Sequence, residues 1–386
     1  MNNMKNKLIP ELRFPEFAND GEWLEGIIEN ITIPESSSIA LNKLELKKEG
    51  YPVYGADSIV GFIDSYQHND NYISIVKDGS GVGRLNLVQQ KSTILGTLIA
   101  LKSKDVKKYE LNWIYYYLNT IDFTSYIKGA GIPHIYYSDY KNEKVLIPKP
   151  KEQQKIASCL SYLDEAITAH TDKLKTLKTY KKGLMQNLFP QDGEKIPKLR
   201  FKEFEKDGDW EESRLGDIAE NFDYKRVPIT SNQREKGNVP YYGASGIIDY
   251  VKGYIYDEKL LCISEDGANL IDRSYPIAFT INGKTWVNNH AHVLKFENEN
   301  TQILVENYIN SINIQDFLTG MAQPKLNRGK LDIIPISLPI NPKEQQKIAE
   351  TLCTLDEIIK EQTTKIDQLR SHKKGLIQGL FPRILK

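Results

Sequence analysis

The sequence contains little cysteine and no long apolar run. Only three cysteines occur in 386 residues, Cys159, Cys262 and Cys353, and no two of them form a CxxC pair. This spacing excludes a disulfide framework and a zinc ribbon. No apolar segment approaches the roughly 18 residues that a membrane-spanning helix needs, and Met1 to Pro10 lack a signal-peptide pattern. We therefore expect a cytoplasmic protein.

The common catalytic and nucleotide-binding motifs are also missing. DGSGVGR, residues 78–84, lacks the GxxxxGK[ST] spacing of a phosphate-binding loop, so we interpret it as a turn after a strand. His290 and His292 alternate as metal ligands on a strand would, but no further ligand stands at a suitable spacing, so we expect no metal. No GxSxG elbow, Cys/His nucleophile or helicase motif occurs. We expect a binding protein without catalytic residues or a cofactor of its own.

The chain has no excess of either charge, with 51 basic and 51 acidic residues. Because phosphate binding needs surplus Lys and Arg, this balance alone argues against a nucleic-acid partner. The distribution is uneven: residues 151–190 and 343–386 each carry +3, whereas residues 1–150 carry −1 and residues 191–342 carry −5. A domain with a net charge of −5 binds DNA only if its basic side chains gather on one face.

One segment of the sequence occurs twice. KEQQKIA stands at residues 151–157 and again at 343–349, and both copies continue through LDE to KKGL and LFP. Aligned without gaps, residues 150–190 and 342–382 are identical at 24 of 41 positions. A period of 192 residues is too long for a solenoid and indicates a duplicated unit. A duplicated unit fits a target of two-fold character.

Each copy of this segment has an uninterrupted 4,3,4,3 spacing of apolar residues. Such heptads predict two helices of about 38 residues, roughly 57 Å long, with Pro150 and Pro342 in their first turns. The predicted coiled-coil seam consists of Ile156, Leu160, Leu163, Ile167, Leu174, Leu177 and Leu184 with Ile348, Leu352, Leu355, Ile359, Ile366, Leu369 and Leu376. Polar residues take the other seam positions, His170, Lys181, Gln362 and Lys373. We expect the two helices to pair with each other and to run antiparallel.

The segments before the helices also match each other. LRF at 12–14 and Trp23 correspond to LRF at 199–201 and Trp210, and the P-x-Y-G-A element recurs at 52–56 and 240–244. YISIV (72–76) and LLCIS (260–264) read as strands that end near Asp-Gly turns, and residues 110–120 and 303–312 read as helices. We predict a mixed α/β class with domains at 1–149 and 191–341 and spacer helices at 150–190 and 342–386.

The candidate binding residues lie in Gly/Pro-containing loops just before the two helices. Residues 129–141 and 320–330 occupy equivalent places and contain the side-chain types that reach base edges and phosphates. From their chemistry alone, these segments are either recognition loops or solvated turns. The candidates for DNA contacts are Lys128, His134, Tyr136, Tyr137, Gln323, Lys325, Asn327 and Arg328, with Lys77, Arg84 and Arg273 on the phosphate side.

The duplicated helix motif, the LRF and Trp pair and the P-x-Y-G-A element together resemble the DNA specificity subunit of type I restriction-modification enzymes. The resemblance covers the whole chain and is most specific in the helices. It implies two target recognition domains that each read half of a bipartite DNA site, with two antiparallel helices between them as a ruler. It also implies two methyltransferase subunits and restriction subunits as partners, which would carry S-adenosylmethionine, ATP and Mg.

Two other interpretations fit parts of the sequence. A non-catalytic coiled-coil scaffold with two protein- or glycan-binding domains would also use Tyr-rich loops. A stand-alone enzyme is disfavoured because the catalytic motifs are missing. Salt-dependent binding to duplex DNA would separate the specificity subunit from the scaffold.

Overall fold

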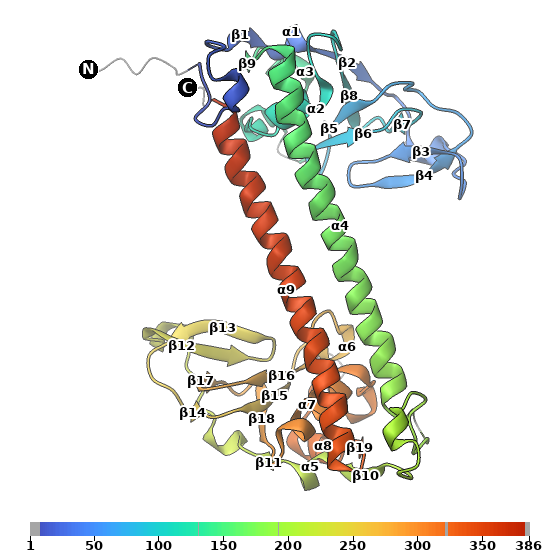
Figure 1. Cartoon of the computed structure of the whole chain (residues 1–386), viewed down its shortest axis with the longest axis vertical. Helices are drawn as coiled ribbons and strands as arrows, with labels where there is room; N and C mark the ends of the chain where they lie inside the picture. The colour runs from blue at the N-terminus through green and yellow to red at the C-terminus, as the bar shows by residue number, and fades with distance from the viewer. Residues whose placement is uncertain (1–7, 130, 192, 321–322, 383–386) are drawn as a thin grey trace. The chain divides into compact units, whose positions relative to one another are not determined.

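The computed structural model describes residues 8–129, 131–191, 193–320 and 323–382. The chain divides into two units, which we call unit 1 (residues 1–171 and 364–386) and unit 2 (residues 172–363). Each unit holds a globular domain and a stretch of two long helices, α4 (Pro150–Leu188) and α9 (Pro342–Leu380) (Figure 1). Both helices have 39 residues, as the heptads predict. The domain boundaries drawn from the sequence remain a prediction.

The domain of unit 1 is built on a four-stranded antiparallel sheet. Its strands are, in spatial order, β2 (Thr32–Ser36), β8 (Leu98–Ser103), β5 (Tyr72–Val76) and β6 (Leu85–Val88). A second sheet has the order β4 (Ile59–Ile63), β3 (Tyr51–Tyr54) and β7 (Thr93–Ile94), and β1 (Leu24–Ile27) pairs with β9 (Lys144–Ile147). The short helices are η1 (Pro15–Phe17), α1 (Ile28–Ile31), η2 (Leu41–Lys43), α2 (Leu111–Leu118), η3 (Phe123–Tyr126) and α3 (Tyr137–Tyr140).

Strand β5 is buried on both faces and coincides with the predicted strand at residues 72–76. Because successive side chains of a strand point to opposite faces, Ile73 and Ile75 join one core cluster, which includes Trp113 of α2 and the start of α4. Tyr72 and Val76 join the other cluster, beside the second sheet. The central sheet therefore lies between helices on one face and a small sheet on the other.

Unit 2 repeats this plan. Its central sheet has the order β11 (Glu220–Asn221), β18 (Ala291–Lys295), β15 (Leu260–Ser264) and β16 (Ala278–Ile281). The second sheet has the order β13 (Gly246–Val251), β12 (Lys236–Gly243), β17 (Lys284–Val287) and β14 (Tyr256–Asp257), and β10 (Glu211–Arg214) pairs with β19 (Pro335–Leu338). The short helices are η4 (Lys202–Phe204), α5 (Leu215–Ile218), η5 (Asp223–Lys225), η6 (Ser231–Gln233), α6 (Asn269–Asp272), α7 (Glu299–Ser311), η7 (Gln315–Phe317) and α8 (Arg328–Asp332).

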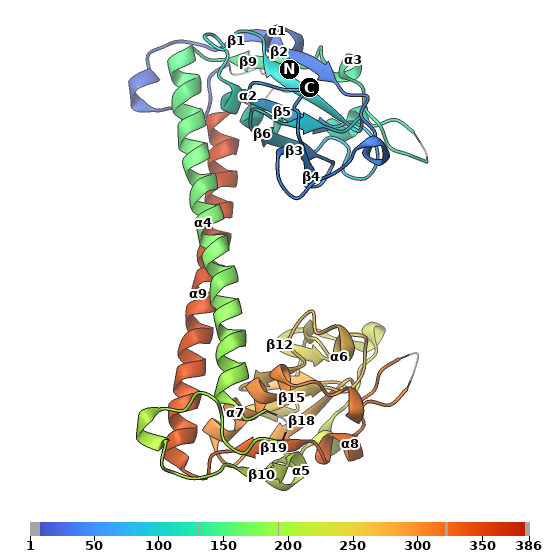
Figure 2. The ribbon, with the colours of Figure 1, turned by 90° about the vertical axis from the view of Figure 1, so that its right-hand side faces the viewer.

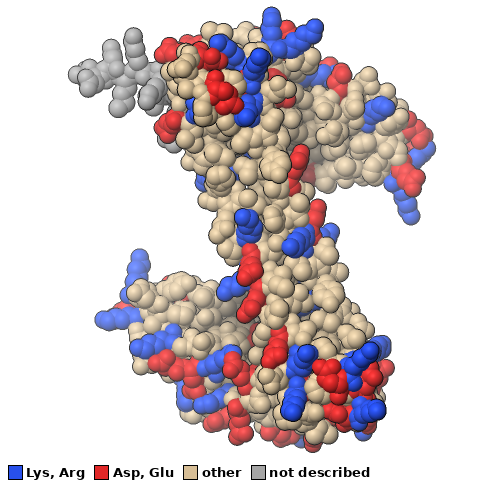
Figure 3. Space-filling view, viewed as in Figure 1, with Lys and Arg blue, Asp and Glu red and all other residues tan. Residues whose placement is uncertain are grey.

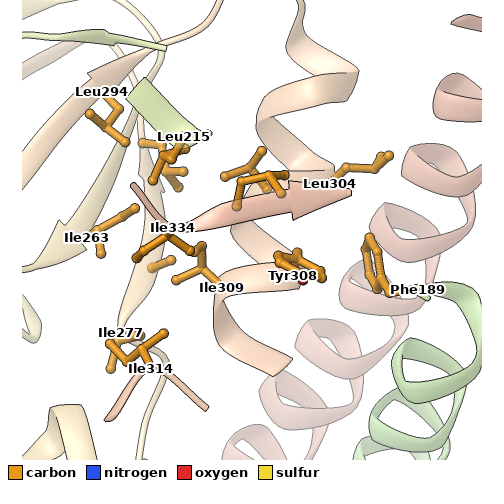
Figure 4. Packing of buried hydrophobic residues seen from close by; sticks show 14 of the residues in the cluster. Phe189, Leu215, Ile263, Ile277, Leu294, Leu304, Tyr308, Ile309, Ile314 and Ile334 are labelled. Atoms are coloured by element: carbon orange, nitrogen blue, oxygen red, sulfur yellow. The ribbon is translucent and has the colours of Figure 1, made fainter. Parts of the chain in front are cut away.

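The core of unit 2 connects the sheet to the long helices. Ile263 of β15 shares a cluster with Tyr308 and Ile309 of α7. Figure 4 shows Tyr308 beside Phe189, which follows α4, and their ring centroids are 5.4 Å apart. This packing ties the end of α4 to the domain that follows it in the chain.

Helix α7 begins earlier than the pattern of apolar residues indicates. The sequence predicts a helix from residue 303, whereas α7 starts at Glu299. The side chain of Asn298 accepts a hydrogen bond from the amide of Asn300 and so supplies the N-cap. The first turn is polar, so apolar periodicity does not reveal it.

The long helices run antiparallel in each unit. In unit 1, Trp23 contacts both Glu152 near the start of α4 and Phe381 just after α9, while Asp164 further along α4 pairs with Lys373. Residue numbers therefore increase along α4 in the direction in which they decrease along α9. In unit 2, Lys181 pairs with Asp356 at 2.6 Å, and these are the repeat equivalents of Lys373 and Asp164. The two ion pairs are thus one contact made twice.

A second duplicated contact fixes each domain to the start of its following helix. Arg13 donates from Nε and Nη2 to the two carboxylate oxygens of Glu152, both at 2.8 Å, and Trp23 Nε1 donates to the same carboxylate at 3.3 Å. The side chains of Arg13 and Glu152 are only 8% and 1% exposed. In unit 2, Arg200, Trp210 and Glu344 repeat this arrangement. The LRF and Trp elements of the sequence therefore act as helix anchors.

Candidate nucleic-acid interface

Each domain presents a loop between two short helices. In unit 1 the loop lies between η3 and α3, and in unit 2 it lies between η7 and α8. We call residues 128–134 loop 1 and residues 319–325 loop 2. Lys128 and His134 exchange two backbone hydrogen bonds of 2.9 Å, and Thr319 and Lys325 exchange two of 2.8 Å. Each loop is therefore closed at its base by the same pair of hydrogen bonds. Figure 2 shows both loops extending from the sheets of their own domains next to α3 or α8.

The base of each loop is held by the turn that follows the central strand. In unit 1, Gly79 donates to the carbonyl of Pro133 at 2.9 Å, and Ile135 donates to the carbonyl of Lys77 at 2.9 Å. Gly79 has a φ of 87°, which explains why the turn carries an Asp-Gly sequence. In unit 2, Gly267 donates to Pro324 and Leu326 donates to Glu265 in the same pattern. The two units thus share one backbone frame and differ in the side chains upon it.

The side chains on loop 1 and on α3 divide into exposed and internal groups. Tyr136 is half exposed, and its ring lies 5.2 Å from that of His134. Lys128 is 58% exposed and contacts Asp139 at 2.7 Å; this hydrogen bond lowers the pKa of Asp139. Tyr137 points inward, with its hydroxyl 3.0 Å from that of Thr32, and burial raises its pKa. Lys128 and His134 of loop 1 and Tyr136 at the start of α3 are therefore accessible to a ligand, whereas Tyr137 supports the fold.

Loop 2 and the start of α8 carry four of the predicted residues. Gln323 and Arg328 are exposed, and Arg328 contacts Asp332 one helical turn away at 3.5 Å. Lys325 is half exposed and reaches Glu265 at 3.1 Å. Asn327 is the N-cap of α8, because its side-chain oxygen accepts from the amide of Lys330 at 3.1 Å. The structure thus adds a capping role to the base-reading role predicted for Asn327.

The three phosphate-side candidates lie in different environments. Lys77 is 21% exposed and pairs with Asp78, and Arg84 is 47% exposed and pairs with Asp57. Arg273 donates to the carbonyls of Ile309 and Ile312 at 3.2 and 3.0 Å, at the end of α7, and burial lowers its pKa. These contacts favour a structural role for Arg273, because its guanidinium donates hydrogen bonds to carbonyls at the C-terminal end of α7 that lack partners within the helix.

A cluster of charged side chains next to loop 2 could not be recognised from the sequence. His292 lies between the carboxylate of Asp223, 2.6 Å from Nδ1, and the carbonyl of Leu326, 2.7 Å from Nε2. Arg226 contacts Glu265 at 2.6 Å and Asp223 at 3.3 Å. The sequence marks only His292, because the other members come from separate elements. These contacts join η5, β18, the residue that follows β15 and the residue that follows loop 2.

The electrostatics of this cluster favour ionised carboxylates. Burial acts to raise the pKa of Asp223 and of Glu265. Hydrogen bonds from His292 to Asp223 and from Arg226 to Glu265, with the surrounding positive charge, outweigh burial and hold both pKa values below their usual range. The cluster is therefore a network of ion pairs.

Asp223, Glu265 and His292 also have the chemical types and the proximity of a metal site, with ligand atoms within 4.8 Å of one another. Their hydrogen bonds do not fit a metal. Both nitrogens of His292 already face oxygen acceptors, and Arg226 places a positive charge on both carboxylates. A metal ligand needs an imidazole nitrogen with a free lone pair.

Comparisons with known proteins identify the family. A family model described as "Type I restriction modification DNA specificity domain" matches residues 29–179 and again residues 207–371. The chain belongs to this family. The two matches fall on the two copies of the repeat, so the specificity domain is present twice. The resemblance noted in the sequence is confirmed.

Individual relatives agree with this assignment. The MjaVIII specificity subunit of Methanocaldococcus jannaschii is 26% identical over 81% of this chain and 79% of its own. A putative specificity subunit of Haemophilus influenzae is 37% identical over 125 residues, which are 32% of each chain. A crystal structure of the S subunit from M. genitalium matches 98% of this chain and all of its own, with a TM-score of 0.73 and 18% identity. The chain is thus a type I DNA specificity subunit with the mixed α/β fold of that family.

The specificity subunit has no single-sign surface on the face that Figure 3 shows. There, Lys and Arg side chains alternate with Asp and Glu over both units. The zero net charge is therefore matched by a mixed surface on this face. Among the described residues, no helix is long and apolar enough to cross a membrane.

All the predicted seam residues of the specificity subunit are buried or half-buried. Those near the ends of the helices join the domain cores: Ile156 and Leu160 belong to the cluster of unit 1, and Ile348 and Leu352 to that of unit 2. At two of the polar seam positions, Lys181 and Lys373 form the ion pairs with Asp356 and Asp164. Polar seam residues therefore make defined contacts between the helices.

Proposed function

We propose that this specificity subunit reads a bipartite DNA sequence, with loop 1 and α3 at one half-site and loop 2 and α8 at the other. One observation carries the proposal: the two loops share their backbone hydrogen bonds but carry different side chains at the described positions, with Lys128, Ile132 and His134 in place of Thr319, Gln323 and Lys325. A constant frame with variable side chains suits two domains that present different hydrogen-bonding groups to different base edges. The scaffold interpretation has no comparable support.

The proposed base-contacting residues are Lys128, His134 and Tyr136 for one half-site and Gln323, Lys325, Asn327 and Arg328 for the other. Lys77 and Arg84 are proposed to face phosphates, because both are cationic and lie beside the turn that holds loop 1. On DNA binding, Lys77 and Arg84 would exchange their carboxylate partners, Asp78 and Asp57, for phosphate oxygens.

We also propose that the complex contains two methyltransferase subunits and restriction subunits that dock on the helices and domains. A structure of a type I system described in terms of complex assembly resembles this chain with a TM-score of 0.51 over 94% of its length. S-adenosylmethionine, ATP and Mg would bind to those partners. With partners clamping the DNA, a neutral specificity subunit does not need to supply the whole phosphate-binding surface.

The helices are proposed to set the spacing between half-sites. Deleting one heptad from each of α4 and α9 removes an equal length from both and retains the heptad phase. Genomic methylation would then be mapped by single-molecule sequencing, with and without the altered subunit. The expected result is a changed gap between unchanged half-sites. An unchanged gap would exclude the ruler, and the absence of any bipartite methylated motif with the unaltered subunit would exclude the proposed function.

Salt dependence provides a second test. Lys77→Ala should weaken binding to all duplexes alike. It should also reduce the slope of log affinity against log salt by about one unit, because one phosphate contact is lost. The matched control is Lys107→Ala, a lysine in the turn before α2. A loss confined to one DNA sequence would contradict a phosphate-facing role for Lys77.

A further inference from the structure

The duplicated P-x-Y-G-A element forms the same hairpin turn in both units. We call residues 55–58 hairpin turn 1 and residues 243–246 hairpin turn 2. Turn 1 joins β3 to β4, and turn 2 joins β12 to β13 (Figure 1). Both strand pairs are antiparallel, and both shift register at the tyrosine of the element, Tyr54 or Tyr242. The element therefore builds one turn twice.

The two turns share their backbone and differ in what they expose. A Cβ on Gly55 would lie only 2.8 Å from Val60, and one on Gly243 would lie 3.3 Å from the isoleucine that corresponds to Val60, so close packing favours glycine in both turns. An alanine follows in each. The next position is Asp57 in turn 1, with a side chain that is 78% exposed, and Ser245 in turn 2, which is also exposed.

Hairpin turn 1 lies beside the turn that holds loop 1. Asp57 forms an ion pair with Arg84, whose carbonyl accepts from the amide of Val76 at 3.0 Å. Val76 is the last residue of β5, and the segment that follows it holds loop 1 through the hydrogen bond from Gly79 to Pro133. Asp57 therefore stands at the end of the central sheet that carries loop 1.

Hairpin turn 2 has the same place in unit 2. The hydroxyl oxygen of Ser264, the last residue of β15, lies 2.5 Å from the carbonyl oxygen of Ala244. The next residue, Glu265, accepts from the amide of Leu326 directly after loop 2. The contact to hairpin turn 2 and the contact to loop 2 thus come from adjacent residues. A duplex that contacts either loop is therefore brought next to the adjoining hairpin turn.

The carboxylate of Asp57 restricts which base it can contact. An ionised carboxylate accepts hydrogen bonds and donates none. In the major groove, guanine presents the acceptors N7 and O6 and thymine presents the acceptor O4, so both repel it. Adenine presents its amino group next to the acceptor N7, whereas cytosine presents its N4 amino group alone. Cytosine therefore suits Asp57, while the hydroxyl of Ser245 can donate or accept and rejects no base on these grounds.

The ion pair explains how Asp57 becomes selective only on DNA. In the proposed function, Arg84 exchanges Asp57 for a phosphate oxygen. The carboxylate then loses its counter-ion in a strongly negative environment unless a base amino group donates to it. A wrong base leaves that charge without a partner, and such a penalty contributes to specificity by rejection.

We propose that the hairpin turns are a second base-contacting element of each unit, in which Asp57 selects cytosine through its N4 amino group in one half-site and Ser245 holds the equivalent, unselective position in the other. The inference rests on the proposed function, in which the neighbouring loops read the half-sites. It adds a specificity-determining residue that lies outside the loops.

Loss of selection is tested on duplexes that carry the mapped methylation motif, with each base pair replaced in turn. The full chain is used together with its methyltransferase partners, and discrimination is the ratio of affinities for the matched and the altered duplex. Asp57→Ser should lower discrimination by about tenfold at one cytosine of one half-site and leave the other base pairs unchanged. The matched control Asp64→Ser removes a carboxylate that is 77% exposed and paired with Lys47, at the opposite end of the same hairpin.

Gain of selection is the sharper test. Ser245→Asp places a carboxylate in hairpin turn 2 and should create a preference of about tenfold for cytosine at one position of the other half-site. Because a misfolded domain cannot acquire a base preference, this result is informative even if Asp57→Ser lowers stability. Ser231→Asp, which adds the same charge at an exposed serine of η6, should create no preference.

Three results would overturn the inference. They are full discrimination in Asp57→Ser, a loss that Asp64→Ser shares, and a Ser245→Asp variant that binds the motif without a new preference. If such a result is found while His134→Ala and Gln323→Ala each relax one half-site, the hairpin turns do not read bases and the proposed function stands. If the chain and its partners discriminate between no duplexes, both fail.

Discussion

Arg13 and Glu152 form a buried bidentate ion pair between the first described segment of the chain and the first turn of α4. The guanidinium also donates from Nη1 to the carbonyl of Gly21 at 2.6 Å, so three of its five donor positions are used. Arg200 and Glu344 reproduce the pair in unit 2, down to the carbonyl of Gly208. Duplication has therefore preserved a whole hydrogen-bond network.

This network predicts that either anchor is costly to break. Glu152→Gln removes the negative charge and leaves Arg13 buried without a counter-ion, which should destabilise unit 1 by about 3–5 kcal/mol. Glu344→Gln should cost a similar amount in unit 2. Chemical denaturation followed by hydrogen exchange would assign each loss to its unit. As a control, Glu16→Gln alters the exposed pair with Lys155 and should leave stability nearly unchanged.

The helix ion pairs should show small and equal coupling energies. The Asp164 and Lys373 side chains are 40% and 19% exposed, and those of Asp356 and Lys181 are 50% and 21% exposed. A double-mutant cycle with Asp164→Asn and Lys373→Met should give a coupling of about 0.5–1 kcal/mol, reduced by salt. The cycle with Asp356→Asn and Lys181→Met should match it. Couplings that differ severalfold would show that the two pairs are not equivalent.

Asn327 can be separated into its capping and its reading role. Asn327→Asp keeps a side-chain oxygen for the amide of Lys330 but loses the amide donor, so α8 should remain stable. We expect its half-site preference to relax, with each altered base pair worth about 1–3 kcal/mol. Asn327→Ala should lose the cap as well, at about 1 kcal/mol of stability. If Asn327→Asp retains full discrimination in a binding assay, Asn327 does not read bases.

Unit 2 should lose stability in acid through its charged cluster. The pKa values of Asp223 and Glu265 lie below their usual range in the folded protein. Such carboxylates contribute stability that is present above the unfolded pKa and is lost as pH falls through the folded pKa. Asp223→Asn cannot ionise, so unit 2 of this variant should be less stable at neutral pH and its stability should vary less with pH below about pH 4. Asp57→Asn, an exposed control, should leave the acid transition of unit 2 unchanged.

Much of this fold could be predicted because local patterns agree with it. The strands at 72–76 and 260–264 coincide with β5 and β15, since runs of buried β-branched and apolar residues suit a strand covered on both faces. The heptads predicted α4 and α9, and proline marked the first residue of each. The start of α7 could not be read, because a cap made by Asn298 carries no apolar periodicity.

The candidate site was predictable only as a location. The spacing of Gly and Pro placed both loops, but their side-chain types could not show that Tyr137 turns inward to Thr32 or that Arg273 closes a helix end. Those outcomes depend on neighbours that are distant in the sequence. His292 was recognised as a possible ligand, and its actual contacts with Asp223 and Leu326 span 69 and 34 residues.

The sequence by itself determined the duplication, the two long helices and the fold class, because these follow from repetition and from periodicity within continuous segments. The family followed from the resemblance of the repeated motifs to those of a known family. The tertiary structure decided which residues touch: Arg13 with Glu152, Asp164 with Lys373, and His292 with Leu326. The physical reason is that hydrogen bonds and ion pairs form over distances of about 3 Å in space. Sequence spacing fixes that proximity only within a single helix or strand.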